Sequence, residues 1–472
     1  MDIVNNIPIN IGLFGHIDSG KTAIAEVLSE IISTAGIDAH PQSKKRGITI
    51  DLGFTCFVLD KYLITLVDAP GHADLIKVSA SSVEIIDLAL IVIDITKGPQ
   101  IQTGEHLIMI QSLNIKNIIV VLNKTDVFSG NLEEQQDKTK KFFESTTFGA
   151  NIPIFMVSAK KRTGFKELKD GILEIIKRID INREIQDDVI IPIDHYFNLK
   201  GKGTIVTGTI VSGKVKINQD LFILPMKLKG RVKSIETFYK NAESASAGHR
   251  VGINIKNIDI KKIYRGCYLT DNPDAFEFGD IIEVEVNKAD LFTQNINFGM
   301  QVHITIGMLT VAGKLFPYKK VEEKKVKLQV SKDKTQFRAI LWLNKKILIR
   351  KKRTIMLLSR LDLPPTTLRI LGASELIKNH DKIPVFYKYK IKRGRISSLD
   401  NPQGLICTGL AQSLIGARKI LGKKLESPFT KVLDTFGTKG SVIIGIEDKK
   451  IEVKLHDPLF LKELRNFKLK KI

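Results

Sequence analysis

Gly15-His16-Ile17-Asp18-Ser19-Gly20-Lys21-Thr22 fits the pattern G-x-x-x-x-G-K-[ST] and follows the apolar run Ile9–Phe14. A strand that leads into such a loop, with a helix after it, forms a phosphate-binding site from backbone N–H groups and the positive end of the helix. The lysine is expected to reach the β- and γ-phosphates, and the threonine hydroxyl is expected to bind Mg²⁺. The residues assigned to nucleotide binding in this loop are Asp18, Ser19, Gly20, Lys21 and Thr22.

The composition indicates a multidomain globular protein with a polyanionic partner. The chain has 472 residues, of which 43% are hydrophobic, and a formal net charge of +22. Residues 386–472 contain 19 lysines and arginines against 8 acids, so +11 of that charge lies in the last segment. A merely lysine-rich, solvated surface is the alternative, but such an excess favours nucleic acid as a partner.

The cysteines and the apolar runs exclude several classes of protein. Cys56, Cys267 and Cys407 lie far apart and form no C-x-x-C pair, so neither a disulfide framework nor a zinc knuckle is predicted. The start of the chain lacks a basic segment, and acidic residues close off the run Leu88–Ile93. We therefore expect a cytoplasmic protein without a signal peptide, a membrane span or a membrane partner.

The hydrophobic pattern divides the chain into four parts. Residues 1–179 alternate short apolar runs with helical segments, which is typical of βαβ units and a largely parallel sheet. Short β segments with glycines between them predict β-barrel domains at 180–271 and 272–385. Residues 386–472 read as a basic, mainly β domain. The predicted fold is therefore an α/β P-loop domain followed by β-barrel domains and a small C-terminal β domain.

Further segments follow in the order that a guanine nucleotide site requires. Asn123-Lys124-Thr125-Asp126 follows the apolar run Ile118–Leu122, and Asp126 can accept hydrogen bonds from the N1–H and N2–H₂ groups of guanine. Adenine lacks those donors. Ser158-Ala159-Lys160 can supply a backbone N–H toward guanine O6. The residues assigned to the base are Asn123, Lys124, Asp126, Ser158, Ala159 and Lys160.

Two other segments suit the γ-phosphate and its metal. Thr49, in Gly47-Ile48-Thr49, can offer its hydroxyl to Mg²⁺ and its N–H to the phosphate. In Asp68-Ala69-Pro70-Gly71-His72, Asp68 can reach the metal and the N–H of Gly71 can bind the γ-phosphate. The predicted metal ligands are Thr22, Thr49 and Asp68.

At these residues the chain resembles the translational GTPases, the family of elongation factor Tu. The resemblance implies that His72 is the catalytic residue that positions the attacking water, and that Ile17 and Ile48 form the apolar gate beside it. It also implies a GTPase that uses GTP, GDP and Mg²⁺ and is stimulated by the ribosome. On this interpretation, hydrolysis changes the loops around the γ-phosphate and releases a bound partner.

The second domain departs from elongation factor Tu at two places near the expected aminoacyl group. In Ile191-Pro192-Ile193-Asp194-His195 a histidine replaces the second of two acidic residues, and His249-Arg250 replaces acidic and amide residues. A fixed cation suits a single anionic side chain, and selenocysteine is ionised at neutral pH whereas serine is neutral. The predicted selenocysteyl pocket consists of Asp194, His195, His249 and Arg250.

With the segment Lys44–Phe54 and the extra basic domain, these residues resemble the selenocysteine-specific elongation factors of the archaeal and eukaryotic type. The resemblance covers nearly the whole chain. It implies a monomer that delivers selenocysteyl-tRNA to the ribosome at recoded UGA codons. It also leaves open whether the factor meets the mRNA selenocysteine element directly or through an accessory protein.

Three alternatives differ in specific residues. A general aminoacyl-tRNA carrier of the elongation factor 1 alpha type usually has a further serine in the loop, which Gly20-Lys21-Thr22-Ala23 lacks. The initiation factor 2 gamma subunit often carries a cysteine knuckle in its GTPase domain, where this chain has only Cys56. A non-catalytic RNA-binding scaffold would have no need of Thr49, Asp68 and His72.

Overall fold

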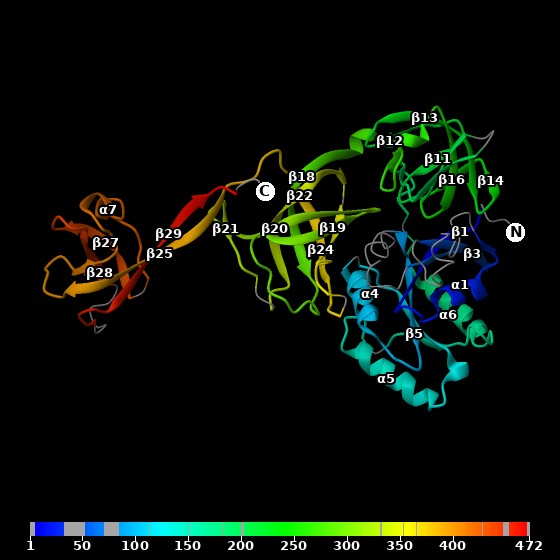
Figure 1. Cartoon of the computed structure of the whole chain (residues 1–472), viewed down its shortest axis with the longest axis horizontal. Coiled ribbons are helices and arrows are strands. Elements are labelled where there is room, and N and C mark those ends of the chain that lie inside the picture. Colours follow the sequence, from blue (N-terminus) through cyan, green and yellow to red (C-terminus); the bar gives the residue numbers. More distant parts are fainter. Residues whose placement is uncertain are drawn as a thin grey trace. The chain divides into compact units, whose positions relative to one another are not determined.

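The computed structural model describes residues 5–32, 52–69, 85–112, 114–149, 151–181, 183–199, 203–330, 333–352, 354–364, 366–426, 428–446 and 453–469. The chain divides into two compact units (Figure 1). The first contains Met1–Pro317 and Gln329–Asp381, and the second contains Tyr318–Leu328 and Lys382–Ile472. The short segment Tyr318–Leu328, which the sequence pattern places in the third domain, therefore groups with the C-terminal residues.

A seven-stranded sheet forms the centre of the first domain, in the order β2-β3-β4-β1-β5-β6-β7. The β2–β3 and β3–β4 pairs are antiparallel, and the other neighbours are parallel, as the alternating pattern predicts. The strands are β1 (Ile7–Phe14), β2 (Ile31–Ile32), β3 (Gly53–Leu59), β4 (Tyr62–Asp68), β5 (Leu88–Asp94), β6 (Ile118–Asn123) and β7 (Ile154–Met156). The helices are α1 (Lys21–Leu28), α4 (Ile101–Ser112), α5 (Leu132–Glu144) and α6 (Phe165–Arg178), with a 3-10 turn at Thr125–Val127.

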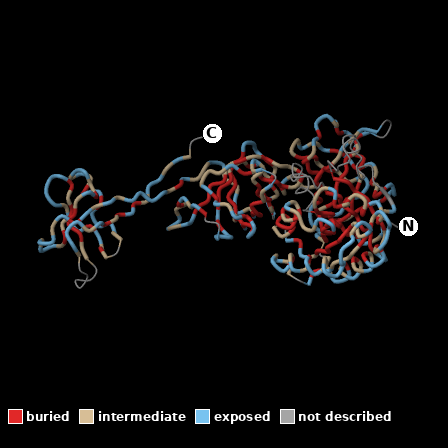
Figure 2. Tube along the Cα trace, turned by 60° about the horizontal axis from the view of Figure 1, so that its bottom comes forward, coloured by how far each residue is buried: buried red, intermediate tan, exposed pale blue. Residues whose placement is uncertain are grey.

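The buried sheet explains why these strands read as continuous apolar runs. Strand β5 is buried along its whole length, and helix α6 turns its apolar residues Leu168, Ile172 and Ile176 to the core at helical spacing. Buried segments run through the interior of this part of the chain (Figure 2). The parallel strands end at one edge of the sheet. The loops after β1, β5 and β6 therefore meet there, which is where an α/β sheet usually binds its ligand.

The second domain is an antiparallel β structure around a core of its own. Its main sheet has the order β8-β17-β12-β13-β16-β10-β9, and β14 pairs with β13. Strands β11 and β15 form a separate pair. The strands are β8 (Ile190–Pro192), β9 (His195–Leu199), β10 (Gly203–Thr209), β11 (Lys214–Lys216), β12 (Asp220–Leu224), β13 (Leu228–Thr237), β14 (Lys240–Ala242), β15 (Ser244–Ser246), β16 (Arg250–Lys256) and β17 (Tyr268–Thr270).

The third domain is built on long antiparallel strands. Strand β18 pairs with both β22 and β24, and β19 pairs with β20 and β23. The inward positions of β18 are apolar and buried, among them Ile282, Val284 and Val286. The strands are β18 (Phe276–Lys288), β19 (Met300–Ile306), β20 (Leu309–Val321), β22 (Gln336–Arg350), β23 (Ile355–Ser359) and β24 (Ile370–Asn379).

The second unit consists of a small β domain and a long antiparallel pair. Strands β25 and β29 pair from Phe386–Phe467 to Arg395–Pro458, and β21 runs parallel to β25. Burial opposes ionisation of Glu463 on β29, but hydrogen bonds from Lys423 and Arg465 outweigh it and lower the pKa to about 2. The elements are β21 (Lys324–Lys327), β25 (Phe386–Ser398), β26 (Leu405–Thr408), α7 (Leu414–Arg418), β27 (Phe429–Phe436), β28 (Ser441–Ile446) and β29 (Pro458–Phe467).

The three cysteines lie in the interior of the protein. Cys56, Cys267 and Cys407 are buried and free, one in each of three separate cores. Burial raises the pKa of the Cys56 thiol to about 12, which keeps it protonated and unreactive at neutral pH.

Candidate functional site

The loop between β1 and α1 has the conformation that its glycines allow. Gly20 precedes α1 with φ 93°, and a Cβ there would lie 2.1 Å from Nδ2 of Asn123. Gly15 has φ 145°, and a Cβ there would lie 2.1 Å from the carbonyl oxygen of Val92. Since only glycine tolerates both the positive φ and the close approach, the two glycines of the motif fix the path of the loop.

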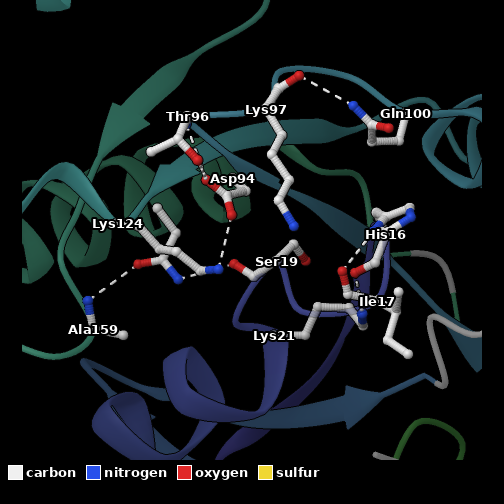
Figure 3. Close-up of polar contacts among 11 residues, drawn as sticks. His16, Ile17, Ser19, Lys21, Asp94, Thr96, Lys97, Gln100, Lys124 and Ala159 are labelled. Atoms are coloured by element: carbon white, nitrogen blue, oxygen red, sulfur yellow. Dashed lines mark hydrogen bonds and ion pairs between the residues drawn. The ribbon is translucent and has the colours of Figure 1, made fainter. Parts of the chain in front are cut away.

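Lys21 is folded over this loop. Its Nζ donates a hydrogen bond to the carbonyl oxygen of His16 at 2.9 Å (Figure 3). A second bond, of 3.1 Å, ends on the carbonyl oxygen of Gly15. Burial lowers the pKa of Lys21 to about 8, against the opposing influence of the nearby Asp68 and Asp18 carboxylates. The ammonium group is thus held at the loop, where it can also bind phosphate oxygens.

The two predicted metal ligands that the structure describes lie together. The hydroxyl of Thr22 donates to Oδ2 of Asp68 at 2.8 Å, and Asp68 is buried at the end of β4. A hydroxyl and a carboxylate are ligands that Mg²⁺ accepts, and the ion usually takes its other ligands from phosphates and water. The arrangement fits a magnesium ion. Among the described residues, no three or more His, Cys, Asp or Glu side chains form a further metal site.

Asn123 joins the phosphate loop to the base-recognition segments. Its Nδ2 donates to the carbonyl oxygen of Ser19 at 3.0 Å, and its Oδ1 accepts from the N–H of Ala159 at 3.1 Å. The hydroxyl of Ser158 donates to Oδ1 of Asp126 at 2.6 Å and lowers the pKa of that carboxyl. Asp126 is therefore ionised and oriented to accept the N–H groups of a guanine.

The structure adds residues that the sequence analysis did not assign. Asp94, at the end of β5, pairs with Nζ of Lys124 at 2.8 Å and accepts from the hydroxyl of Thr96 at 2.6 Å (Figure 3). Its place after a buried parallel strand is the signal that could have identified it. On α4, Gln102 and His106 accept hydrogen bonds from the N–H groups of Ile17 and Gly15. No local motif points to those two residues.

Other predicted residues are exposed or lie outside the described ranges. Asp18 and Lys160 are exposed, and Ile17 is half-buried in the loop. Ile48, Thr49, Gly71 and His72 fall outside the residues that the structure describes, so their roles stay predictions from the sequence.

Arg250 is the centre of a second polar cluster, in the second domain. Its guanidinium binds the Asp194 carboxylate with two hydrogen bonds, of 2.6 and 3.1 Å, and both side chains are at least 95% buried. Burial opposes ionisation of Asp194, but the charge of Arg250 and the contact with His195 outweigh it and hold the pKa well below its usual range. The hydroxyl of Thr207 also donates to this carboxylate, at 2.6 Å.

The first domain contributes an aromatic ring to this cluster. Cζ of Arg250 lies 3.3 Å from the ring centroid of Phe54 on β3, which places the guanidinium flat against the ring. The adjoining backbone is also tied across the two domains, because Nδ2 of Asn10 donates to the carbonyl oxygen of Gly248 at 3.0 Å. Arg250 is therefore fixed from both sides.

Arg250 also lines a pocket of about 240 Å³ with mainly apolar and aromatic walls. The other three residues predicted for the selenocysteyl pocket do not line this cavity. Asp194 contacts the guanidinium of Arg250 and does not reach the cavity. His195 is partly exposed, and its Nδ1 lies 3.0 Å from Oδ1 of Asp194. Nδ1 of His249 lies 3.1 Å from the carbonyl oxygen of Ser246. The pocket is lined by Phe197, Leu199, Ile205, Thr207, Ser234, Glu236, Phe238, Tyr239, Arg250, Val251, Gly252 and Asn254.

No helix in the described part of the chain is long and apolar enough to cross a membrane. The family models that match are the elongation factor Tu GTP-binding domain at residues 6–178, elongation factor Tu domain 2 at residues 203–270, and domain III of the archaeal selenocysteine-specific elongation factor at residues 276–380.

Similar proteins cover most of the chain. The selenocysteine-specific elongation factor of Methanocaldococcus jannaschii is 39% identical over 97% of this chain and 98% of that protein. The mouse (Mus musculus) factor of the same name is 37% identical over 65% of this chain and 56% of that protein. The crystal structure of elongation factor SelB from Methanococcus maripaludis with the GTP analogue GppNHp matches with a TM-score of 0.83, at 36% identity over 98% of this chain and 100% of that one. Because the similarity runs through all the domains, this chain belongs to the family of selenocysteine-specific elongation factors, and it is a translation factor that binds and hydrolyses GTP.

Proposed function

We propose that Arg250, held between Asp194 and Phe54, recognises the selenolate of selenocysteyl-tRNA, which this elongation factor delivers to the ribosome at recoded UGA codons. The observation that carries the proposal is the buried, doubly hydrogen-bonded guanidinium at the wall of a pocket in the second domain. A buried arginine has little rotational freedom. It therefore presents its charge at one fixed place, which suits the recognition of one anionic group.

The different acidities of the selenocysteine and serine side chains, carried as esters of the same tRNA, support this role of Arg250. A selenol is more acidic than a thiol and is largely ionised at neutral pH, whereas the hydroxyl of serine is neutral. Both amino acids are carried by the same tRNA body, so the factor has to discriminate at the side chain. The apolar and aromatic walls beside Arg250 would accommodate the end of the tRNA that carries the ester.

The GTP site would control this binding. We propose that Lys21 and the loop amides hold the phosphates and that Asn123, Asp126 and Ser158 hold the guanine. Mg²⁺ would be held by Thr22, Thr49 and Asp68, of which the first and third lie in contact. Bound there, the ion would neutralise charge on the β- and γ-phosphates. His72, with Ile17 and Ile48 as its apolar gate, would position the attacking water.

The basic second unit suits an RNA partner. We propose that it contributes contacts with tRNA, the ribosome or the mRNA selenocysteine element, the last either directly or through an accessory protein. Support comes from the charge of +11 in residues 386–472 and from the exposed cations of β25. The factor would act as a monomer in the cytoplasm, where translation takes place.

The decisive experiment compares two esters of one tRNA. Selenocysteyl-tRNA and seryl-tRNA are incubated with the full chain and GTP or GDP, and the rate of ester hydrolysis is measured. We expect GTP-dependent protection of the selenocysteyl ester and much weaker protection of the seryl ester. Equal protection of both would show a general aminoacyl-tRNA carrier. Binding that does not depend on the nucleotide would show an RNA-binding scaffold.

A further inference from the structure

Helix α4 (Ile101–Ser112) contacts both the phosphate-binding loop and the third domain. It is not part of any nucleotide-binding motif in the sequence. Three of its side chains, those of Gln102, Glu105 and His106, make hydrogen bonds away from their own helix, and two of these bonds end on backbone N–H groups of the loop. The helix therefore contacts the backbone of the phosphate-binding loop directly.

The contacts with the loop fix two of its amides. Oε1 of Gln102 accepts from the N–H of Ile17 at 3.2 Å, and Nδ1 of His106 accepts from the N–H of Gly15 at 3.1 Å. Positions 102 and 106 are four residues apart, so both acceptors lie on one face of the helix. These two acceptors hold the backbone of the first half of the phosphate-binding loop against α4.

His106 can act as an acceptor only while Nδ1 carries no proton. The side chain is 3% exposed, and its ring lies 5.6 Å from that of Phe14. Burial, aided by the nearby charge of Lys21, lowers the pKa of His106 to about 3. The imidazole is therefore neutral throughout the physiological pH range, and its hydrogen bond with Gly15 does not depend on pH.

A buried ion pair fixes the neighbouring face of α4 to the third domain. Nε and Nη2 of Arg369 donate to the two oxygens of Glu105 at 2.9 and 3.0 Å, and the backbone N–H of Arg369 adds a third bond of 3.1 Å. Glu105 is 1% exposed and Arg369 is 3% exposed. The preceding residue, Gly104, lies so close to Leu368 that a Cβ there would come within 3.3 Å of its Cδ2.

This geometry makes the helix a rigid connection. A doubly hydrogen-bonded arginine–carboxylate pair allows little rotation or sliding, and a helix transmits a displacement of one turn to the next. Arg369 immediately precedes β24, so its position is set by the barrel of the third domain. A shift of that barrel would move Glu105 and, with it, the acceptors at positions 102 and 106.

We propose that α4 sets the rate of nucleotide release by holding the amides of Gly15 and Ile17, and that Arg369 of the third domain positions α4 for this task. Gln102, Glu105, His106 and Arg369 are positioning residues, because none of them belongs to the predicted nucleotide contacts. The arrangement of the third domain thereby influences how long GDP or GTP stays bound.

The experiment measures the dissociation rate of a fluorescent GDP from the full chain by stopped flow. Gln102→Leu and His106→Leu each remove one acceptor, so we expect release to become about two- to tenfold faster, the range for one hydrogen bond. His106→Asn keeps an acceptor oxygen near the position of Nδ1 and should restore a rate close to that of the parent. Gln111→Leu is the matched control, because it makes the same change on the last turn of α4 and should have no effect.

The link to the third domain is tested by Arg369→Met, with Arg338→Met on the exposed face of β22 as its control. Faster release from the first variant alone is expected. Since Arg369→Met leaves Glu105 buried without its partner, the double variant Glu105→Leu/Arg369→Leu is measured as well, and thermal melting confirms that each variant is folded. A parent release rate in the folded double variant would overturn the proposal.

A double-mutant cycle separates positioning from general loosening. If Arg369 acts through His106, adding Arg369→Met to His106→Leu should accelerate release by less than it does in the parent. Fully additive effects would mean that the ion pair stabilises the domain interface without positioning the loop, and would also refute the proposal.

Discussion

Replacing Arg250 tests the selenocysteyl pocket most directly. Arg250→Gln alone would leave the Asp194 carboxylate buried and unpaired, which typically costs about 3–5 kcal/mol of stability. The double variant Asp194→Asn/Arg250→Gln avoids this problem, because it exchanges the ion pair for two neutral groups that can still hydrogen-bond. A second variant, Arg250→Lys, keeps the charge but loses the planar fork and the flat contact with Phe54.

The expected loss of selectivity follows from the geometry of the pair. At an effective dielectric constant of about 20, a selenolate about 4 Å from the guanidinium gains about 4 kcal/mol. Asp194 binds the guanidinium through contacts of 2.6 and 3.1 Å, and a carboxylate about 7 Å from the selenolate offsets about 2.4 kcal/mol of that gain. The remaining ~1.6 kcal/mol corresponds to a preference of ~15-fold over the neutral serine.

The assay is the protection of the two esters on one tRNA body, with GTP affinity measured in parallel. The neutral double variant should protect both esters about equally, and Arg250→Lys should keep part of the preference. GTP affinity should not change, because the phosphate and base contacts lie in the first domain. Arg231→Gln is the matched control, since Arg231 forms an exposed ion pair with Asp220 on the same barrel.

A parent-like preference in the folded double variant would refute the assignment of Arg250. Loss of protection for both esters together would instead mean that the pair is needed to bind the end of the tRNA, without choosing between the two amino acids. Either result would leave the identity of the cargo intact and would remove only the electrostatic account of how it is selected.

Three further predictions concern other parts of the chain. The His72→Ala variant should bind GTP normally, but its ribosome-stimulated rate of GTP hydrolysis should fall by at least ~10²-fold, because the histidine is expected to position the attacking water. Single-turnover rates measure this effect, and an unchanged stimulated rate would contradict the prediction. Truncation after Asp381 should weaken RNA or ribosome binding and flatten its dependence on salt, since residues 386–472 carry a charge of +11; an unchanged slope would mean that these charges are only solvated. Glu463→Gln should lower the free energy of unfolding of the second unit by about 3 kcal/mol at pH 7, because the folded pKa of about 2 lies below the unfolded value of 4.5. That stabilisation is complete above pH ~4.5 and disappears as the pH falls through about 2, so a difference in melting that does not vary with pH would argue against the ion cluster.

The nucleotide site could be predicted because its chemistry is encoded in short segments. Gly20, Asn123 and Ser158 lie at or after the ends of parallel strands, and such strands bring these residues to one edge of the sheet. The contact of Asn123 with both Ser19 and Ala159 is a consequence of that topology. Sequence spacing therefore carried most of the information about which residues meet there.

Contacts that depend on packing between domains were not predictable in this way. His106 lies in the middle of a helix whose buried residues include Leu107, Ile108 and Met109, so nothing in the local pattern separates an acceptor from a core residue. Glu105 and Arg369 are 264 positions apart. Without an alignment or a fold, no periodicity links two such residues, and only the packing of α4 against β24 brings them together.

The selenocysteyl pocket shows a different limit. From the sequence, His249 and Arg250 are expected to add positive charge to the pocket, and Asp194 is expected to be a separate member of it. In the structure Asp194 neutralises Arg250, and His249 contacts its own turn at Ser246. Residue types alone give the charges in a pocket, but the electrostatic field at a ligand depends on which of those charges are paired. The pairing of Asp194 with Arg250 could be seen only once strands β9 and β16 were placed in the fold.

If Arg250 selects the cargo as proposed, its contact with Phe54 would connect selection of the tRNA to the state of the nucleotide. Phe54 pairs with Val67 in the β3–β4 ladder, and the adjacent Gly53 pairs with Asp68, whose carboxylate accepts the Thr22 hydroxyl in the phosphate-binding loop. The β3–β4 pair thus contains Asp68, a predicted metal ligand, and, one register position away, Phe54, which contacts Arg250. Because the guanidinium contacts both Asp194 from the second domain and Phe54 from the first, its position depends on the docking of these two domains. A change at the γ-phosphate that displaced β3 would therefore move Phe54 and weaken the contact between Arg250 and the selenolate. Arg250, which is proposed to select the selenocysteyl-tRNA, would then also take part in its release.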